Sequence, residues 1–576
     1  MQKMRAIIAR EITKLLENAE ASEIESLIEY PPNPEMGDLS LPCFKLSKQL
    51  RKPPQAIAEE LKSRIGLDSF ARVEAVSGYL NFYLDGARFA SSVISEALTQ
   101  GDRYGSRNIG EGGKVVIDYS SPNIAKPFHI AHLRSTVIGH ALYRIHEFLG
   151  FDCVGVNHLG DWGTQFGKLI VAYRQWGDAA EVESDGIDEL LRLYVKFHDE
   201  AERDPSLEDQ ARNWFVRMEQ GDEEALTLWR RFVDISLAEF KRIYELLGVS
   251  FDSYTGESFY NGRMEAVVAE LREKALLEED NGAWLVRLDA YDMPPALILK
   301  KDGSSLYHTR DITAALYRKA TYDFRKAIYV TDYAQNLHFA QWFKVVELMG
   351  YGWAKDLVHV PFGRVSLEGA SLSTRRGNVL KLEDVLNQAI AKTREIMEAR
   401  PQPIADVETV SRQVGVGAVI FHDLGSSRIK DIDFKWEDVL NFEGESGPYV
   451  QYTHARACSV LAKAEAAGLA LCEIGQQAPG EAVLGALPIN EATVRLAKEL
   501  SLFGERVELA MHKLEPSIVA RCLVDVAQAF NRFYHECRIM AEEDGVRTAR
   551  LALVQAAKLT LANGLRLIGL EAPEKI

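Results

Sequence analysis

The feature of the chain that most constrains its fold is a pair of short apolar runs separated by one amphipathic stretch. Residues 115–117 read Val-Val-Ile, and residues 153–156 read Cys-Val-Gly-Val. Between them, apolar residues recur at helical spacing up to a terminating glycine, namely Ile130, Leu133, Val137, Ala141, Ile145, Phe148 and Gly150. A strand, a crossover helix and a second strand are the unit from which doubly wound parallel sheets are built. The pattern therefore predicts an α/β fold with a Rossmann-type parallel sheet.

The rest of the chain divides around this unit. Further strand-like runs at 296–299, 327–330 and 357–360 extend the predicted sheet, and a charged, mostly helical insertion fills about 165–285. A glycine-rich stretch at 101–113 marks a boundary, and strand signals end after Asp433. We therefore expect a small N-terminal α/β domain over 1–110, the parallel-sheet domain with its helical insertion over 111–370, a connecting region over 371–440, and a C-terminal helical bundle over 441–576.

Composition limits the possible partners and the compartment. The chain has 576 residues and a formal net charge of -17, from 84 acidic and 67 basic residues. So acidic a protein is not an indiscriminate nucleic-acid binder, although local basic patches remain compatible with it. The six cysteines are widely spread and form no Cys-x-x-Cys pair, so we expect a reducing interior and neither a disulfide framework nor a zinc site. No apolar run approaches the roughly 20 residues that cross a bilayer. We therefore expect a cytoplasmic protein with no membrane partner.

Two histidines stand between the first predicted strand and its crossover helix. Open α/β sheets bind ligands beyond the carboxyl ends of their strands, and the amides of a helix N-terminus favour anions. His129 and His132 are three residues apart, so both project from one face of the first helical turn. Two imidazoles placed there can donate hydrogen bonds to phosphate oxygens. A zinc-ligand pair and two structural histidines are the alternatives, although no cysteine or carboxylate stands at zinc spacing nearby.

The same stretch resembles a known signature. Residues 121–136 read Ser-Pro-Asn-Ile-Ala-Lys-Pro-Phe-His-Ile-Ala-His-Leu-Arg-Ser-Thr, which is similar to the HIGH signature of class I aminoacyl-tRNA synthetases and resembles arginyl-tRNA synthetases in particular. Further segments match that family in the same order at 160–165, 307–311, 332–335, 372–378 and 445–456. The resemblance covers nearly the whole chain. It implies ATP-dependent attachment of L-arginine to tRNA(Arg) through an arginyl-adenylate, with release of AMP and pyrophosphate.

Two other functions stay open beside this one. The first is a class I synthetase of other specificity or a related nucleotidyltransferase, and the second is a non-catalytic tRNA-binding paralogue. Residues 371–378 raise the second possibility, because they read Ser-Leu-Ser-Thr-Arg-Arg-Gly-Asn and lack both lysines of the class string Lys-Met-Ser-Lys-Ser-x-Gly-Asn. In many arginyl enzymes a lysine just upstream of the HIGH signature compensates, and Lys126 takes that place. The resemblance therefore implies catalytic roles for Lys126, His129 and His132.

The resemblance also implies which residues bind ATP, with Mg²⁺ as its partner. Besides the two histidines, the implied contacts are Gly160, Asp161 and Gly163 around the adenosine, and Ser373, Arg375 and Arg376 on a basic loop over the phosphates. The glycines permit close approach of the backbone. A mobile loop of this kind can close over the reacting phosphates. We expect no zinc and no other metal held by protein ligands alone.

For L-arginine, the resemblance points to both halves of the sheet domain. A planar guanidinium with five fixed donors needs carboxylates, an amide oxygen and an aromatic face. The implied contacts are Asp118, Ser120, Asn123, His132, Tyr307, Asp311 and Gln335. Tyr307 and Asp311 are four residues apart, so on a helix they share a face. Lysine would leave the acceptors unpaired, which accounts for selectivity without an editing domain.

The remaining partner implied by the resemblance is tRNA(Arg). The N-terminal domain resembles the family's additional tRNA-contacting domain, with Tyr79 and Asn81 as base contacts, and the region 371–440 carries the signature loop and a contact with the tRNA stem. The C-terminal bundle resembles the anticodon-binding domain. Its Asn531, Tyr534 and His535 offer groups for stacking and hydrogen bonding to bases, whereas Phe530 and Phe533 fit the bundle core. We expect the protein to act as a monomer.

Overall fold

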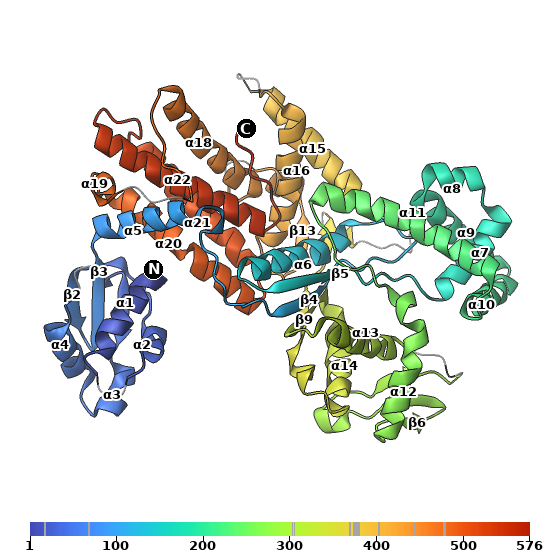
Figure 1. Ribbon diagram of the computed structural model, residues 1–576. Coiled ribbons are helices and arrows are strands. Elements are labelled where there is room, and N and C mark those ends of the chain that lie inside the picture. Colours follow the sequence, from blue (N-terminus) through green and yellow to red (C-terminus); the bar gives the residue numbers. More distant parts are fainter. Residues whose placement is uncertain are drawn as a thin grey trace.

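The structure is a computed structural model, and it describes residues 1–16, 19–66, 70–301, 303, 306–367, 370–371, 381–400, 404–441, 444–475 and 480–576. Figure 1 shows a parallel sheet near the centre of the molecule. The N-terminal domain (blue) and the C-terminal helices (orange to red) lie on one side of this sheet, and the helical insertion (green to teal) projects on the other.

The central sheet is parallel and has the strand order β10-β9-β4-β5, which confirms the predicted fold class. Its strands and covering helices are β4 (Lys114–Asp118), α6 (Ile130–Phe148), β5 (Asp152–Val156), α13 (Tyr307–Tyr322), β9 (Lys326–Asp332), α14 (Asn336–Leu348) and β10 (Leu357–Phe362). At the carboxyl edge, Asp118 of β4 pairs in register with Val156 of β5 and with Tyr329 of β9. This edge is the place where open α/β sheets hold their ligands.

One predicted strand of this sheet lies elsewhere. Residues 296–299 form a strand, β8 (Ala296–Leu299), but it pairs antiparallel with β7 (Ala283–Val286), which pairs in turn with β6 (Glu278–Asp280). The prediction that this run extends the parallel sheet is therefore wrong. An apolar run indicates a buried strand but not its partner. Here the run packs in a hydrophobic cluster that includes residues of α12 (Met264–Glu273), α13 and one face of the parallel sheet.

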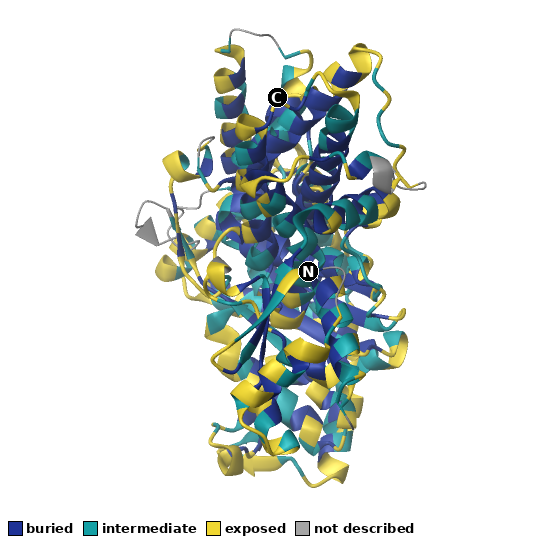
Figure 2. Cartoon of the chain, turned by 90° about the vertical axis from the view of Figure 1, so that its left-hand side faces the viewer, coloured by how far each residue is buried: buried dark blue, intermediate teal, exposed yellow. Residues whose placement is uncertain are grey.

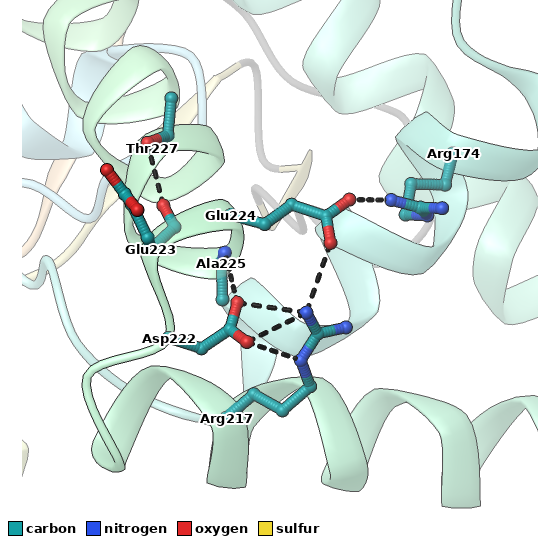
Figure 3. Close-up of polar contacts among 7 residues, drawn as sticks. All are labelled: Arg174, Arg217, Asp222, Glu223, Glu224, Ala225 and Thr227. Atoms are coloured by element: carbon teal, nitrogen blue, oxygen red, sulfur yellow. Dashed lines mark hydrogen bonds and ion pairs between the residues drawn. The ribbon is translucent and has the colours of Figure 1, made fainter.

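The insertion is helical from residue 164 to residue 247 and comprises α7 (Thr164–Trp176), α8 (Ala179–Asp185), α9 (Ile187–Arg203), α10 (Ser206–Glu219) and α11 (Glu223–Leu247). Figure 3 shows the turn that joins its last two helices. Asp222 caps α11 by accepting from the amide of Ala225 at 2.9 Å, and Arg217 of α10 pairs with both Asp222 and Glu224. Glu224 also contacts Arg174 of α7. These exposed pairs join three helices at the point where α11 turns back toward the sheet.

The N-terminal domain is a small antiparallel sheet covered by helices. Its elements are α1 (Gln2–Thr13), α2 (Ala21–Leu27), β1 (Leu39–Pro42), α3 (Phe44–Leu50), α4 (Pro54–Arg64), β2 (Phe70–Val76) and β3 (Tyr79–Leu84), with the strand order β1-β3-β2. Strand β3 is the central strand of this sheet. Leu80, Phe82 and Leu84 on it are buried in the domain core.

The C-terminal part is a bundle of long helices. It consists of α18 (Gly447–Ala466), α19 (Glu481–Leu484), α20 (Glu491–Lys513), α21 (Ser517–Glu536) and α22 (Asp544–Leu567), and α5 (Gly86–Gln100) packs against α20 and α22. Figure 2 shows buried residues in the interior of this bundle and exposed ones on its outside. Phe530 and Phe533 are fully buried, which confirms their predicted place in the core.

A connecting region joins the sheet domain to the bundle. It contains α15 (Leu382–Glu398), α16 (Val407–Leu424), β13 (Ile432–Phe434) and α17 (Trp436–Val439), and the short strands β11 (Val365–Leu367) and β12 (Ala370–Ser371) lead into it. Arg134 of α6, which is fully buried, holds this region to the sheet domain. Its guanidinium donates to the carbonyls of Gly363, Arg428 and Lys430 at 2.9, 3.1 and 2.7 Å, and it lies 3.3 Å from the carboxylate of Asp423.

Candidate active site

The segment between β4 and α6 has an unusual backbone. Ser120, Ser121 and Ala125 have φ angles of +69°, +49° and +59°, in the left-handed region that non-glycine residues seldom occupy. A residue in a sparsely populated conformation costs about 1–3 kcal/mol and persists only where its surroundings fix it. Such strain clusters at functional sites. Here it falls on the stretch that leads from the sheet edge to the histidine pair.

Side chains from neighbouring elements fix the first two strained residues. The amide of Ser120 donates to Oγ of Ser135 on α6 at 2.9 Å. The amide of Ser121 donates to Oδ1 of Asn157, just beyond β5, at 3.2 Å. Ser135 Oγ also donates to the carbonyl of Val330 on β9 at 2.7 Å, so the loop is tied to three elements of the sheet domain.

The two histidines lie together at the start of α6, on one face as their spacing predicts. Their rings stack with centroids 3.8 Å apart. The backbone amide of His129 donates to Nδ1 of His132 at 3.1 Å. Because Nδ1 accepts this bond, a neutral His132 carries its hydrogen on Nε2, where it can be donated to a ligand.

Both imidazoles are neutral near pH 7. Burial lowers the pKa of His129 to about 4, and the positive charge of Lys126 acts in the same direction. Burial also lowers the pKa of His132 well below its usual range, again with help from His129 and Lys126. A neutral imidazole still donates one hydrogen bond, and a nearby anion favours its protonated form. The pair is therefore suited to meet phosphate oxygens.

The predicted phosphate loop falls on residues 372–380, so its three predicted ATP contacts lie outside the described residues: Ser373, Arg375 and Arg376. The residues that follow the loop contact the histidine segment directly. Lys381 forms an antiparallel bridge with His129, and the amide of Leu382 donates to the carbonyl of Phe128 at 2.9 Å. The chain that follows the signature stretch is therefore fixed beside the histidine pair.

Asp118, a predicted arginine contact, is paired with an arginine of the chain itself. Its Oδ2 lies 2.7 Å from the guanidinium of Arg318, a fully buried side chain of α13. Its Oδ1 accepts from Oγ of Ser121 at 2.9 Å. The charge of Asp118 is therefore balanced from within the protein.

Asp311 has a different environment. It lies on α13, one turn after Tyr307, and its Oδ2 is 2.5 Å from Nε2 of His338 on α14. In the described part of the chain it forms no ion pair with lysine or arginine. Tyr307 is 68% exposed, so its ring is available to a ligand. Gln335, at the end of η5 (Tyr333–Gln335), is also exposed.

Asn123 and Ser120 take contrasting positions in the loop. Asn123 is exposed and bridges Gly160 in parallel fashion, and a Cβ on that glycine would lie 2.2 Å from Oδ1 of Asn123. A side chain at position 160 would therefore require the Asn123 amide to move. Ser120 is buried, with its hydroxyl 2.7 Å from that of Tyr244 and 2.8 Å from that of Thr136. A direct contact between Ser120 and arginine stays a prediction.

In the segment predicted to bind adenosine, the carboxylate of Asp161 accepts hydrogen bonds from another residue of the protein. Oδ1 of Asp161 accepts from the amide of Ser258 at 2.8 Å, and Oδ2 accepts from the hydroxyl of the same residue at 2.6 Å. Gly163, with a φ of +142°, precedes α7. The Asp161 carboxylate is therefore engaged within the protein, and a contact of residues 160–163 with adenosine stays a prediction.

His158, a half-buried histidine just beyond β5, lies near both halves of the site. Burial lowers the pKa of His158, whereas the carboxylates of Asp118, Asp311 and Asp161 all act on it in the opposite direction. These three acids come from β4, from α13 and from the segment after β5, so the fold brings them within electrostatic range of one imidazole. The ion pair of Asp118 with Arg318 links Asp118 to α13, the helix that also carries Asp311 two turns earlier.

Three residues of this site were not found from the sequence: Arg318, His338 and His158. Weak signals for each are present. Arg318 follows Asp311 by seven residues, which is two helical turns, and His338 follows Gln335 by three. His158 follows the second strand of the βαβ unit by two residues, at the ligand-binding edge of the sheet.

Known sequence families cover almost the entire chain. Residues 2–84 match the "Arginyl tRNA synthetase N terminal domain", residues 450–576 match the "DALR anticodon binding domain", and residues 93–436 match "tRNA synthetases class I (R), catalytic domain". The last match alone spans more than half of the chain. The chain belongs to the arginyl-tRNA synthetase family.

Individual arginyl-tRNA synthetases are similar over their full length. The chain is 55% identical over 555 residues to the arginine–tRNA ligase of Alkaliphilus metalliredigens, covering 96% of each chain. It is 52% identical over 577 residues to that of Clostridioides difficile, covering 100% of each. The solved structure of Thermus thermophilus arginyl-tRNA synthetase superposes with a TM-score of 0.81 at 26% identity, with 100% of both chains covered. The protein therefore has arginine–tRNA ligase activity, and as a class I synthetase it uses ATP; both predictions are confirmed.

The predicted tRNA contacts of the N-terminal domain differ in accessibility. Tyr79 is half-buried and packs edge-on against Phe44, with ring centroids 5.2 Å apart, and Phe44 is 48% exposed. Asn81 is buried, and its Oδ1 accepts from Oγ of Ser40 at 2.6 Å. A base contact by Asn81 would require this pair to open, whereas Tyr79 can reach a ligand beside Phe44.

In the C-terminal bundle, the predicted tRNA contacts Asn531 and Tyr534 lie beside Arg456. The guanidinium of Arg456 lies 5.0 Å from the ring centre of Tyr452 and 5.3 Å from that of Tyr534, and it also contacts the amide oxygen of Asn531. Tyr534 is 37% exposed, and His535 beside it is exposed. These rings and the guanidinium form a surface on which an RNA base can stack.

The described residues contain neither a metal-binding cluster nor a membrane-spanning helix. Within them, no group of three or more His, Cys, Asp or Glu side chains is arranged to hold a metal ion. No helix within the same residues has both the length and the apolar character needed to cross a bilayer. The six cysteines are free thiols, and five of them are buried.

Proposed function

We propose that arginine and ATP meet at the carboxyl edge of the parallel sheet, between the histidine pair and Asp311. The observation that carries this proposal is that Asp118, at the end of β4, pairs with Arg318, which lies two helical turns after Asp311 on α13, beside the strained segment that leads to His129. The substrate carboxylate attacks the α-phosphorus of ATP in line, which forms arginyl-adenylate and releases pyrophosphate. The 2'-hydroxyl of the terminal tRNA adenosine then attacks the activated carbonyl, and AMP leaves.

On the phosphate side, catalysis consists of positioning and charge stabilisation. Lys126 supplies a full positive charge, and His129 and His132 donate hydrogen bonds as charge develops on the phosphates. The loop residues Ser373, Arg375 and Arg376 complete this set. Mg²⁺ would enter bound to the phosphate oxygens of ATP. It would neutralise part of the phosphate charge.

On the arginine side, Asp311 accepts hydrogen bonds from the guanidinium while Tyr307 packs on its plane. Asp118, paired with Arg318, is the second carboxylate of this set. Gln335 offers an amide oxygen to the guanidinium. The α-amino and carboxylate groups of the substrate contact Asn123, Ser120 and His132, and the adenosine lies along Gly160, Asp161 and Gly163.

Replacing Lys126 by alanine is expected to lower kcat for ATP–pyrophosphate exchange by about 10²-fold, because one preorganised charge at the phosphates is lost. The KM for arginine should stay unchanged. The measurement is exchange in the presence of tRNA and arginine. Lys196→Ala is a matched control, because Lys196 also lies over an aromatic ring, 5.2 Å from Trp176, but away from the histidines. A wild-type kcat for Lys126→Ala would show that Lys126 has no catalytic role.

The flanking domains bind tRNA in this proposal. The N-terminal domain contacts it through Tyr79, with Asn81 as a further predicted contact, and the bundle binds the anticodon through Asn531, Tyr534 and His535. One chain carries both surfaces, so a monomer suffices for the reaction. The free thiols fit a cytoplasmic enzyme.

A further inference from the structure

The insertion binds the catalytic segment at the residue before Lys126. The amide of Ala125 donates to Oγ of Ser236 on α11 at 2.9 Å, and the same hydroxyl donates to the carbonyl of Phe232 at 2.8 Å. Ser236 is fully buried, and Ala125 is one of the strained residues, with a φ of +59°. One fixed hydroxyl from the insertion therefore holds a strained residue of the sheet domain.

Other residues of the insertion enclose the same short segment. Nζ of Lys126 lies 6.0 Å from the ring centre of Tyr194 on α9. Phe166 and Leu169 of α7 line a small cavity together with Ala125, Lys126 and Tyr194. Side chains of α7, α9 and α11 therefore lie around the stretch that precedes the histidine pair.

Because Ala125 is strained, removal of the Ser236 hydroxyl is expected to change the backbone at this residue. Without this hydroxyl, the buried amide of Ala125 loses its acceptor, and a left-handed alanine has a more favourable right-handed conformation available. Relaxation of φ and ψ at Ala125 rotates the peptide that leads into Lys126. A displacement of about 1 Å at a reacting group costs roughly 10²-fold in rate.

We infer that Ser236 is a positioning residue, which fixes the strained Ala125 so that Lys126 is held at the ATP phosphates. The inference rests on the proposed role of Lys126 in catalysis. The inference gives the insertion a role in amino-acid activation, because a side chain of α11 positions Lys126. In other class I enzymes, the lysines of the second signature string supply the positive charge that Lys126 supplies here.

The test is a double-mutant cycle in ATP–pyrophosphate exchange with tRNA present. Ser236→Ala is expected to lower kcat roughly 10-fold or more with an unchanged KM for arginine. In the Lys126→Ala background, Ser236→Ala should have no further effect, because the group that it positions is absent. Ser236→Thr, which keeps a hydroxyl, should retain most of the wild-type kcat.

Ser411→Ala is the matched control, because Ser411 is also a buried helical serine, whose hydroxyl donates to the carbonyl of Glu408 at 3.0 Å within its own helix. Circular dichroism at the assay temperature verifies that each variant is folded. Wild-type kcat for Ser236→Ala, or an equal loss with and without Lys126, would overturn the inference. A Lys126→Ala enzyme of full activity would instead overturn the proposed role of Lys126, and this inference with it.

Discussion

Asp311→Asn is expected to reduce kcat/KM for arginine by about 10²–10³-fold and to leave the KM for ATP unchanged. The substitution removes the negative charge that faces the substrate guanidinium but keeps the shape of the side chain. The asparagine amide oxygen can still accept from Nε2 of His338, which holds the present carboxylate at 2.5 Å. The loss therefore reports on the guanidinium and not on a collapsed pocket. Asp311 is the more sensitive of the two acids, since Arg318 already balances Asp118.

Steady-state aminoacylation at varied arginine and varied ATP measures this effect. Asp323→Asn is the control, because Asp323 also lies at α13 but its side chain is 89% exposed and pairs with Lys319 at the helix end. That variant should match the wild type. If Asp311→Asn keeps the wild-type kcat and KM for arginine, Asp311 does not bind the guanidinium.

Arg134→Leu is expected to lower the free energy of unfolding by about 3–5 kcal/mol, because it leaves one buried charge without its partner. Asp423, whose pKa burial already raises, would lose the guanidinium 3.3 Å away. The carbonyls of Gly363, Arg428 and Lys430 would lose their donor as well. The change therefore weakens the junction between α6 and the connecting region.

Denaturant unfolding of the full chain, followed by fluorescence and circular dichroism, measures this loss. In the double variant Arg134→Leu with Asp423→Leu, the loss should be smaller than the sum of the two single losses, because no buried charge is left unpaired. Arg521→Ala removes an exposed arginine that pairs with Glu445, and it should change stability by less than about 1 kcal/mol. Unchanged stability of Arg134→Leu would show that this junction is not held by the buried pair.

The sheet could be predicted because buried parallel strands are continuous apolar runs and α6 has one apolar face. The same reasoning misplaced residues 296–299, since hydrophobicity indicates burial and not the neighbouring strand. The pairing of β8 with β7 depends on a hairpin partner only about ten residues away along the chain, which the apolar pattern does not encode.

Within the site, His129 and His132 were predictable from spacing, and their rings do stack. The pairing of Asp118 with Arg318 was not, because 200 residues separate the two and only the fold brings them together. The strained conformations of Ser120, Ser121 and Ala125 also left no signal, since none of these residues is a glycine. Hydrogen bonds from other elements, and not local sequence preference, determine that backbone.

The most direct test of the central claim is a crystal structure of the enzyme with arginine and a non-hydrolysable ATP analogue. The account predicts the guanidinium within hydrogen-bond distance of Asp311, the phosphates at His129 and His132, and the substrate carboxylate beside the α-phosphate. Ligands bound at separate places, or a guanidinium that does not contact Asp311, would contradict it.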